Sequence, residues 1–361
     1  MTVYVLLAAL LLLTAFIMRG NQPKNLKYVI VACALIYTVY GLRNTHWIGI
    51  DSRYLYLITF NRIRDMTWEQ FWTNNDGFNN LYFVLNKVVA ELGGDYQLFV
   101  SLEALFVTVC FGNMIYRYSP SPIQSICYHL GLLFFIFHIS ALKQSFAMAF
   151  LMLAFDQIVN RRPIRFILLV VLASQFHYPS LVFLPAYWIT YLHPGKYYLI
   201  LLAVVLVLTY IFRDRILNLM LDSYKGGEEE ASMEGVVFLR TKSIIMIGIV
   251  VAAVLFRRPT KEDRIYWYLL EFMGFAIVFQ TFCGYSNIFE RLADYYFQFS
   301  VIFIPMVFDK SSNEKALVHW RFMDVVYSLA PYLFGGYAIY RYFSTIVGDQ
   351  HYVPFRFFFQ S

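Results

Sequence analysis

Long apolar runs separated by short polar stretches fill the chain from its first residues to its last. An α-helix rises about 1.5 Å per residue, so about 20 apolar residues cover the hydrocarbon core of a bilayer. The pattern therefore predicts an all-α polytopic membrane protein, with about 12 transmembrane helices in a single transmembrane domain over residues 1–361. The predicted spans are residues 3–18, 28–42, 98–116, 123–139, 145–159, 166–176, 181–192, 197–212, 243–256, 265–282, 292–308 and 325–346.

Residues 81–92 form a further apolar run that does not fit a plain span, since they include Asn86, Lys87 and Glu91. Polar side chains within an apolar run favour a re-entrant or interfacial helix. Whether this run crosses the membrane is left open by the sequence. The answer decides on which side every later loop lies.

Residues 66–72 predict a short amphipathic helix in the membrane interface. Thr67 is a suitable N-cap, and Trp68, Phe71 and Trp72 recur at helical spacing. An aromatic belt at the interface explains the same pattern and is the favoured interpretation.

Basic residues predict the orientation of the chain, provided that residues 81–92 do not cross. Three basic clusters then share short loops on one side, which the positive-inside rule makes cytoplasmic. Segments 43–97 and 213–242 then lie on the outer side. The second of these contains an acidic run within 223–235, which is interpreted as solvated charge rather than a calcium site. The clusters are Arg19, Lys24 and Lys27; Arg161, Arg162 and Arg165; and Arg257, Arg258, Lys261 and Arg264.

Composition agrees with this class of protein. Of 361 residues, 60% are apolar, 20% are aromatic and only 14% are charged, whereas roughly a quarter of a soluble domain is charged. The net charge of +6 suits anionic lipids and phosphate-bearing substrates. The chain has no basic stripe of the kind that binds nucleic acid, so nucleic-acid binding is not expected. The four cysteines have no metal-binding spacing, so neither a disulfide nor zinc is expected.

Asp51 is the first candidate for chemistry, because it lies between Arg43 and Arg53 in the outer segment. Neighbouring cations keep a carboxylate ionised, which suits a general base or an anchor for a sugar hydroxyl. An ion pair that only shapes the loop is an equally good explanation. Function and structure are left open for this residue.

Lys143 and Gln144 precede the predicted helix 145–159 on its outer side. A cation beside the free N–H groups of a helix start is a ready anion site. The alternative is a lysine that snorkels to the lipid headgroups.

His177 lies in the turn 175–180 between two predicted helices that are short for a bilayer, so this turn is expected to dip into a cavity. An imidazole there can accept a proton near neutral pH, although a hydrogen-bonded structural histidine is as good an interpretation. His129 and His138 are interpreted as structural. The intramembrane acids Glu103, Asp156 and Glu271 receive no role.

Arg291 and Tyr295 share a helix face at the outer start of the span 292–308. Arginine grips phosphate or carboxylate with two parallel hydrogen bonds. An internal ion pair with Glu290 or Asp294 is the alternative.

The motifs that are missing narrow the chemistry. The chain has no nucleotide-binding glycine loop, no Asp-x-Asp pair, no His-Glu-x-x-His helix and no Gly-x-Ser-x-Gly elbow. We therefore expect an outward-facing site without metal or cofactor, whose substrate reaches it from the membrane.

Four motifs together resemble the EpsG-like branch of the Wzy-type polysaccharide polymerases. The likeness departs at Lys143, where the family usually has arginine, and at Asn79 or Asn80, where it usually has an acid. The second departure puts any role carried over to that segment in doubt. The motifs are Arg43 with Gly49-Ile-Asp51, Tyr54 and Tyr56; Ser140-Ala-Leu-Lys-Gln144; Gln175-Phe-His-Tyr-Pro-Ser180; and Glu290-Arg291 with Tyr295 and Tyr296.

The resemblance implies a GT-C-like membrane glycosyltransferase in the bacterial cytoplasmic (inner) membrane. Such an enzyme transfers a glycan from undecaprenyl diphosphate to a lipid-linked repeat unit at the periplasmic or external face, and a chain-length regulator is a candidate partner. The resemblance would make Asp51 or His177 the base that takes the proton of the acceptor hydroxyl group. The residues expected to bind substrate and pyrophosphate are Arg43, Arg53, Tyr54, Lys143, Gln144, Arg291 and Tyr295.

Two rival functions share the same residues. A flippase or transporter would need polar residues at several depths and paired half-sequences, whereas these candidates gather on one side. An O-antigen ligase uses the same lipid-pyrophosphate chemistry with a different acceptor, and only the family likeness separates it from a polymerase.

Overall fold

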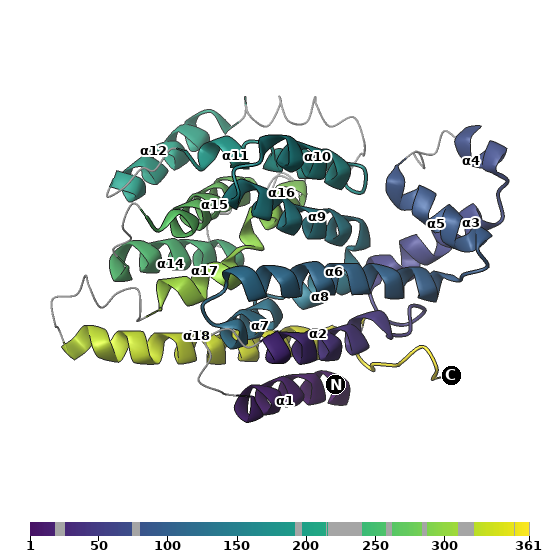
Figure 1. Cartoon of the computed structure of the whole chain (residues 1–361), viewed down its shortest axis with the longest axis horizontal. Helices are drawn as coiled ribbons and strands as arrows, with labels where there is room; N and C mark the ends of the chain where they lie inside the picture. Colours follow the sequence, from purple (N-terminus) through teal and green to yellow (C-terminus); the bar gives the residue numbers. More distant parts are fainter. Residues whose placement is uncertain are drawn as a thin grey trace. The chain divides into compact units, whose positions relative to one another are not determined.

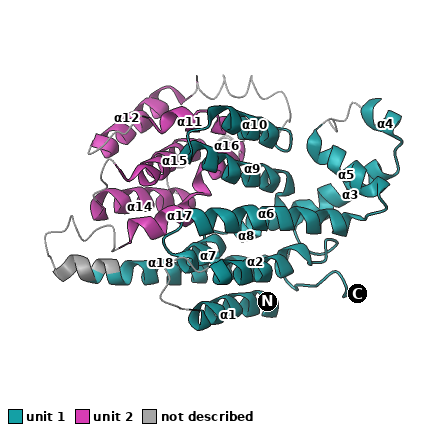
Figure 2. Cartoon of the chain, viewed as in Figure 1, with its two compact units in different colours: residues 1–181, 321–361 teal, residues 182–320 magenta. Residues whose placement is uncertain are grey.

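The structure is a computed structural model of the chain. It describes residues 1–18, 26–73, 80–191, 197–213, 215, 240–257, 262–283, 287–309, 321–349 and 351–360. Within these ranges every regular element is a helix, as the sequence predicts, and one isolated β-bridge joins Arg43 and Phe357. The chain divides into unit 1, residues 1–181 with 321–361, and unit 2, residues 182–320 (Figure 2).

Unit 1 holds most of the candidate residues. Its helices are α1 (Thr2–Ile17), α2 (Leu26–Gly41), the π-helix η1 (Ser52–Tyr56), α3 (Leu57–Arg64), α4 (Trp68–Thr73), α5 (Leu81–Glu91), α6 (Tyr96–Tyr118), α7 (Pro122–Gly131), α8 (Phe134–Ser140), α9 (Leu142–Val159), α10 (Pro163–Ser174) and α18 (Arg321–Gly348). The 3₁₀-helix η2 (Tyr178–Phe183) follows α10. Unit 2 contains α11 (Ala186–Ile189), α12 (Tyr198–Ile211), α14 (Thr241–Phe256), α15 (Arg264–Gln280), α16 (Asn287–Phe297) and α17 (Ser300–Val307).

The apolar helices fit a membrane protein. In the part of the chain that the structure describes, α6 and α9 are each long and apolar enough to cross a bilayer, and α7 with α8 forms one more such segment with a 56° bend. Five shorter apolar helices, of 10–17 residues, accompany them: α1, α2, α10, α12 and α14.

Three of the predicted spans are not continuous helices. Residues 181–191, the described part of the predicted span 181–192, form the end of η2 and the single turn α11, since Pro179 and Pro185 have no N–H to donate to a helical ladder. Residues 292–308 are divided between α16 and α17, with Gln298 and Phe299 at the break.

The predicted span 123–139 is bent between α7 and α8. Leu133 has a φ of 69°, in the left-handed region, and ends the first helix. Gly131 lets α7 approach α18 closely, because a Cβ at Gly131 would lie 2.1 Å from the Cβ of Ala338. The close contact with α18 therefore lies two residues before the bend.

Side-chain contacts show how α2, α6 and α9 of unit 1 run relative to one another. Phe99 lies 6.2 Å from Phe146, and Phe106 lies 4.9 Å from Phe150, so α6 and α9 run parallel. α2 runs antiparallel to α6, since the amide of Gln97 donates to the carbonyl of Gly41 at 3.0 Å. The C-terminal end of α2 and the starts of α6 and α9 thus meet; we call this the site end.

The opposite end of unit 1 carries basic residues, and we call it the basic end. Arg117 at the end of α6 forms an ion pair with Asp156 near the end of α9. Arg162 and Arg165 follow at the start of α10, and both are exposed. Arg19, Lys24, Arg258 and Lys261, which belong to the predicted basic loops, lie outside the described residues, as does the acidic run within 223–235.

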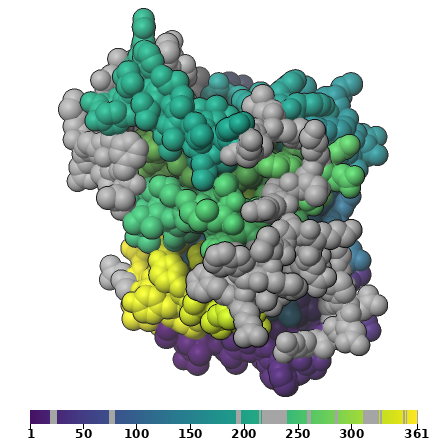
Figure 3. Space-filling model, turned by 90° about the vertical axis from the view of Figure 1, so that its left-hand side faces the viewer, coloured from purple at the N-terminus to yellow at the C-terminus, as the bar shows by residue number. Residues whose placement is uncertain are grey.

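The surfaces of α1 and α18 adjoin in the space-filling view, purple beside yellow (Figure 3). Tyr4 of α1 packs edge-on against Tyr342 of α18, with 6.4 Å between the ring centroids. Away from this contact α18 exposes large apolar side chains, including Leu333 and Tyr340. Such contiguous apolar surface is expected of a helix that faces lipid.

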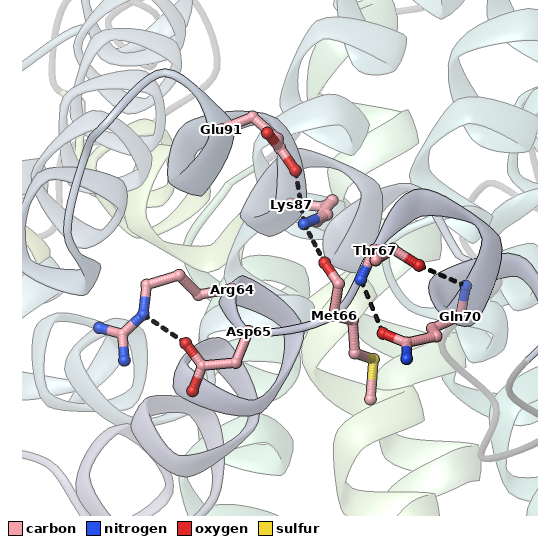
Figure 4. Close-up of polar contacts among 7 residues, drawn as sticks. All are labelled: Arg64, Asp65, Met66, Thr67, Gln70, Lys87 and Glu91. Carbon is pink, nitrogen blue, oxygen red and sulfur yellow. Dashed lines mark hydrogen bonds and ion pairs between the residues drawn. The ribbon is translucent and has the colours of Figure 1, made fainter.

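Helices α3, α4 and α5 gather beside the start of α6 (Figure 1). The capping predicted at Thr67 is confirmed: its backbone N–H donates to Gln70 Oε1 at 2.8 Å, and the Gln70 N–H donates back to Thr67 Oγ1 at 3.2 Å (Figure 4). α5 has 11 residues, about 16 Å of helix, which is too short to cross a bilayer. This length favours the interfacial or re-entrant interpretation of residues 81–92.

Buried Lys87 ties α5 to the preceding loop. Its ammonium group donates to the carbonyl of Met66 at 2.5 Å and pairs with Glu91 at 2.6 Å (Figure 4). The ring of Trp68 lies 5.7 Å from the same nitrogen. Lys87 therefore stabilises the packing of α5 against the loop before α4 at the site end.

Candidate functional site

Arg43 lies directly after α2 and is fully buried at the site end. Its guanidinium group donates to the carbonyls of Tyr40 and Ile139, the latter at 2.9 Å, and stacks over the Tyr40 ring. Nε has no hydrogen-bond partner among the described residues. The charge of Arg43 is thus fixed in place by carbonyl groups from α2 and α8.

Asp51 is held by a loop with an unusual backbone. Gly49 has a φ of 95°, and a Cβ there would lie 2.8 Å from the carbonyl oxygen of Ile139. Only glycine adopts this conformation without strain at such a close approach. The loop then enters η1, and Asp51, half-buried, immediately precedes its first residue.

Arg53 and Tyr54 follow Asp51 within η1. The guanidinium group of Arg53 stacks over the rings of Trp47, at 5.4 Å, and of Tyr54, at 4.9 Å. Tyr54 is exposed, and its ring meets that of His351 edge-on. These two side chains therefore lie on the outside of the loop that carries Asp51.

Lys143 occupies the first turn of α9 and is surrounded by aromatic rings. Its Nζ lies 3.9 Å from the ring centroid of Phe83, 5.5 Å from Tyr82 and 5.7 Å from Tyr56. Cation–π contacts of this kind stabilise an ammonium ion by about 0.5–2 kcal/mol. Gln144, the next residue, is buried.

His177 lies between α10 and η2, in the broken-helix setting that the sequence predicts. Its N–H donates to the carbonyl of Ala173 at 3.1 Å, and its own carbonyl accepts from Ser180 at 3.0 Å. The preceding Phe176 stacks on Phe146 of α9, with 4.7 Å between centroids. Hence α10 returns to the site end, and the turn reaches the same helix as Lys143.

Arg291 and Tyr295 belong to unit 2, on α16. The two carboxylates predicted as alternative partners of Arg291 are engaged by Lys242, which lies 3.1 Å from Glu290 and 2.6 Å from Asp294. Tyr295 is buried. The role of Arg291 in substrate binding stays a prediction.

Unit 1 therefore brings together, at its site end, candidates that are far apart in the sequence. The carbonyl of Ile139 in α8 contacts Arg43, the start of α9 carries Lys143, and η1 joins Asp51 to the aromatic rings around Lys143. Two cationic side chains and a carboxylate therefore lie at the same end of unit 1.

The sequence missed two polar contacts at this end. Glu103, left without a role, accepts the hydroxyl hydrogen bond of Tyr40 with both carboxylate oxygens at 2.7 Å. Tyr352 forms a hydrogen bond of 2.7 Å with Ser140, and neither residue was a candidate for the site by itself. The only hint of Tyr352 in the sequence is the density of aromatic residues in 351–359.

Metal ligands do not cluster in the described ranges, where no three His, Cys, Asp or Glu side chains come together. The four cysteines are free thiols. Asn79, one of the two positions at which the predicted family likeness departs, lies outside the described residues, and Asn80 caps α5 by accepting from the N–H of Phe83 at 3.3 Å.

Comparison with known proteins gives one match. The sequence profile of the EpsG family matches residues 26–355, which include all the elements of the site end. Neither the curated proteins nor the solved structures gave a match.

Proposed function

Because the chain belongs to the EpsG family, a membrane protein family of the polysaccharide-polymerase type, we propose that it polymerises lipid-linked repeat units. The donor is a glycan on undecaprenyl diphosphate, and the acceptor is a second lipid-linked repeat unit. The reaction takes place at the outer face of the bacterial cytoplasmic membrane, and the protein has a GT-C-like architecture.

In the proposed step, a hydroxyl oxygen of the acceptor sugar attacks the anomeric carbon of the donor. The bond between that carbon and the pyrophosphate oxygen breaks, and undecaprenyl diphosphate leaves. Asp51 accepts the proton of the hydroxyl group. Lys143 and Arg43 offset the negative charge that develops on the leaving pyrophosphate.

One observation carries this proposal: Asp51, Arg43 and Lys143 lie at one end of unit 1, and exposed basic residues lie at the other. The positive-inside rule then puts the basic end in the cytoplasm and the site end outside. Lipid-linked repeats presented at the outer leaflet would meet the site there. A transporter would instead need polar groups at several depths.

Purified protein in liposomes, given lipid-linked repeat units alone, should produce a ladder of polymers. A product confined to a different acceptor, such as a lipid A core, would indicate a ligase. No product with either acceptor, together with movement of the lipid-linked unit across the bilayer, would indicate a flippase and overturn the proposal.

The same assay tests metal independence, which the spacing of the acids predicts. Activity should persist in excess EDTA, because the positive charges of Lys143 and Arg43 take the place of a cation at the pyrophosphate. Loss in EDTA with rescue by magnesium or manganese would contradict this prediction. It would direct attention to Glu228, Glu229 and Glu230.

A further inference from the structure

The last described residues of the chain pack directly on the loop that carries Asp51. The N–H of Asn44 donates to the carbonyl of Arg356 at 2.8 Å, and the N–H of Phe358 donates to the carbonyl of Leu42 at 3.0 Å. These two bonds frame the bridge between Arg43 and Phe357. We call the described residues 349 and 351–360 the C-terminal segment.

A third backbone hydrogen bond reaches closer to the candidate base. The N–H of Gly49 donates to the carbonyl of His351 at 3.2 Å. Side chains reinforce this pairing, since the guanidinium group of Arg356 lies 4.5 Å from the ring of Trp47. Residues 42–49 contain no helix, so these contacts add to the few hydrogen bonds within the loop, such as that from the N–H of Ile48 to the carbonyl of Asn44 at 3.0 Å.

Tyr352 is the side chain of this segment that points to the site. It is only 5% exposed, and its hydroxyl lies 2.7 Å from Ser140 Oγ, three residues before Lys143. Burial raises the pKa of Tyr352, the hydrogen bond with Ser140 lowers it in part, and the carboxylates of Asp349 and Asp51 raise it against the opposing effect of Arg43. The phenol therefore stays protonated at neutral pH, close to the charges of the proposed reaction.

We propose that Tyr352 is a positioning residue for the transfer reaction, and that the C-terminal segment sets the Asp51 loop against the segment from Ser140 to Lys143. The inference rests on the proposed function. Its physical basis is that Asp51 lies in the loop before η1 and Lys143 lies in α9, directly after α8. The Tyr352–Ser140 hydrogen bond and the three backbone hydrogen bonds join these two elements. A displacement of about 1 Å in a catalytic group can cost about 100-fold in rate.

The central test is Tyr352→Phe, which removes one hydroxyl group and leaves the ring. We expect kcat for polymerisation to fall roughly 10- to 100-fold with little change in KM, and the melting temperature to stay at the wild-type value. Tyr332→Phe is the matched control, because Tyr332 in α18 is 74% exposed, and it should have wild-type kinetics.

Double mutants separate positioning from general loosening. Ser140→Ala should reproduce the loss of kcat, and the double variant Tyr352→Phe with Ser140→Ala should be no slower than either single one. Multiplicative losses, or a wild-type kcat for Tyr352→Phe, would overturn the proposal. If Tyr352→Phe does not accumulate in the membrane, Ser140→Ala alone decides, since it removes the same hydrogen bond.

A labelling experiment tests the packing without any activity. In a variant whose four native cysteines are replaced by serine or alanine, a thiol introduced by Ser140→Cys should react slowly with a hydrophilic maleimide. Adding Tyr352→Ala should raise the labelling rate at least severalfold. An equal rate in both variants would show that the segment does not cover Ser140. The expected difference in labelling, together with a wild-type protein that makes no polymer in liposomes, would count against the proposed function alone.

Discussion

At the scale of single residues, the two cations of the site end are held in different ways. Arg43 donates directed hydrogen bonds to the carbonyls of Tyr40 and Ile139, so its orientation is fixed. Lys143 meets the faces of aromatic rings, and its Nζ is 3.9 Å from the centroid of Phe83. Since cation–π attraction is less directional than a hydrogen bond, Lys143 is the better suited of the two to turn toward an arriving pyrophosphate.

Substitution of Lys143 tests this difference. Lys143→Ala should abolish polymer formation while the protein stays folded, because the positive charge is lost at the leaving group. Lys143→Arg should keep more activity than Lys143→Ala, since guanidinium also stacks on aromatic rings and binds phosphate. The length distribution of polymer in cells and the membrane level of each variant are the measurements. Unchanged polymer in Lys143→Ala would remove Lys143 from the site.

The assignment of the base rests on a comparison between Asp51 and His177. Asp51→Asn should leave single repeat units in place of a ladder, because a well-placed base contributes about 100- to 10,000-fold in rate. His177→Ala should still give short chains, since the backbone of His177 is fixed by Ala173 and Ser180 whatever its side chain. Expression and melting temperature are the controls. The reverse pattern would assign the proton to the imidazole and make Asp51 a structural residue.

At the scale of elements, the close crossing of α7 and α18 depends on a single glycine. Gly131 meets Ala338, and no side chain fits between the two helices there. Gly335, on α18, has nothing within 4 Å of its would-be Cβ. A side chain is therefore excluded at Gly131 but can be accommodated at Gly335.

Gly131→Val should therefore destabilise unit 1, by about 1–3 kcal/mol if the helices separate slightly to admit the side chain. Gly335→Ala is the matched control and should be neutral or stabilising by about 0.5–1 kcal/mol, as expected for glycine replaced inside a helix. Thermal melting in detergent, followed by loss of monodisperse protein, measures both. Equal melting temperatures for Gly131→Val and wild type would show that α7 and α18 do not pack this closely.

At the scale of the whole molecule, the direction of the helices in unit 1 makes a prediction about topology. A thiol introduced by Tyr54→Cys at the site end should react with an impermeant maleimide added to intact cells with a permeable outer layer. A thiol introduced by Arg162→Cys at the basic end should react only after the cytoplasmic membrane is opened. Both side chains are exposed. Labelling of Arg162→Cys from outside would invert the orientation and contradict an outward-facing site.

The sequence by itself determined the class of the protein, and it supplied the candidate residues that the proposed site uses. Apolar runs of bilayer length predict helices because each backbone N–H and C=O in lipid must be satisfied within its own segment. The local patterns at Thr67 and in the turn around His177 were also readable, since a cap and a broken helix depend on neighbouring residues. The family likeness to EpsG is confirmed over residues 26–355.

Only the tertiary structure decided which residues surround the candidates. Tyr352 and Ser140 are 212 positions apart, and the aromatic rings around Lys143 come from α5 and η1, far from α9 in the sequence. Periodicity reports which face of a helix is apolar but not which other helix covers it. For the same reason the bend at Leu133 and the break within 292–308 were not predicted, because an apolar run does not show where its helix stops. The break within 181–192 did have a local signal in Pro185, which the prediction of a single span did not use.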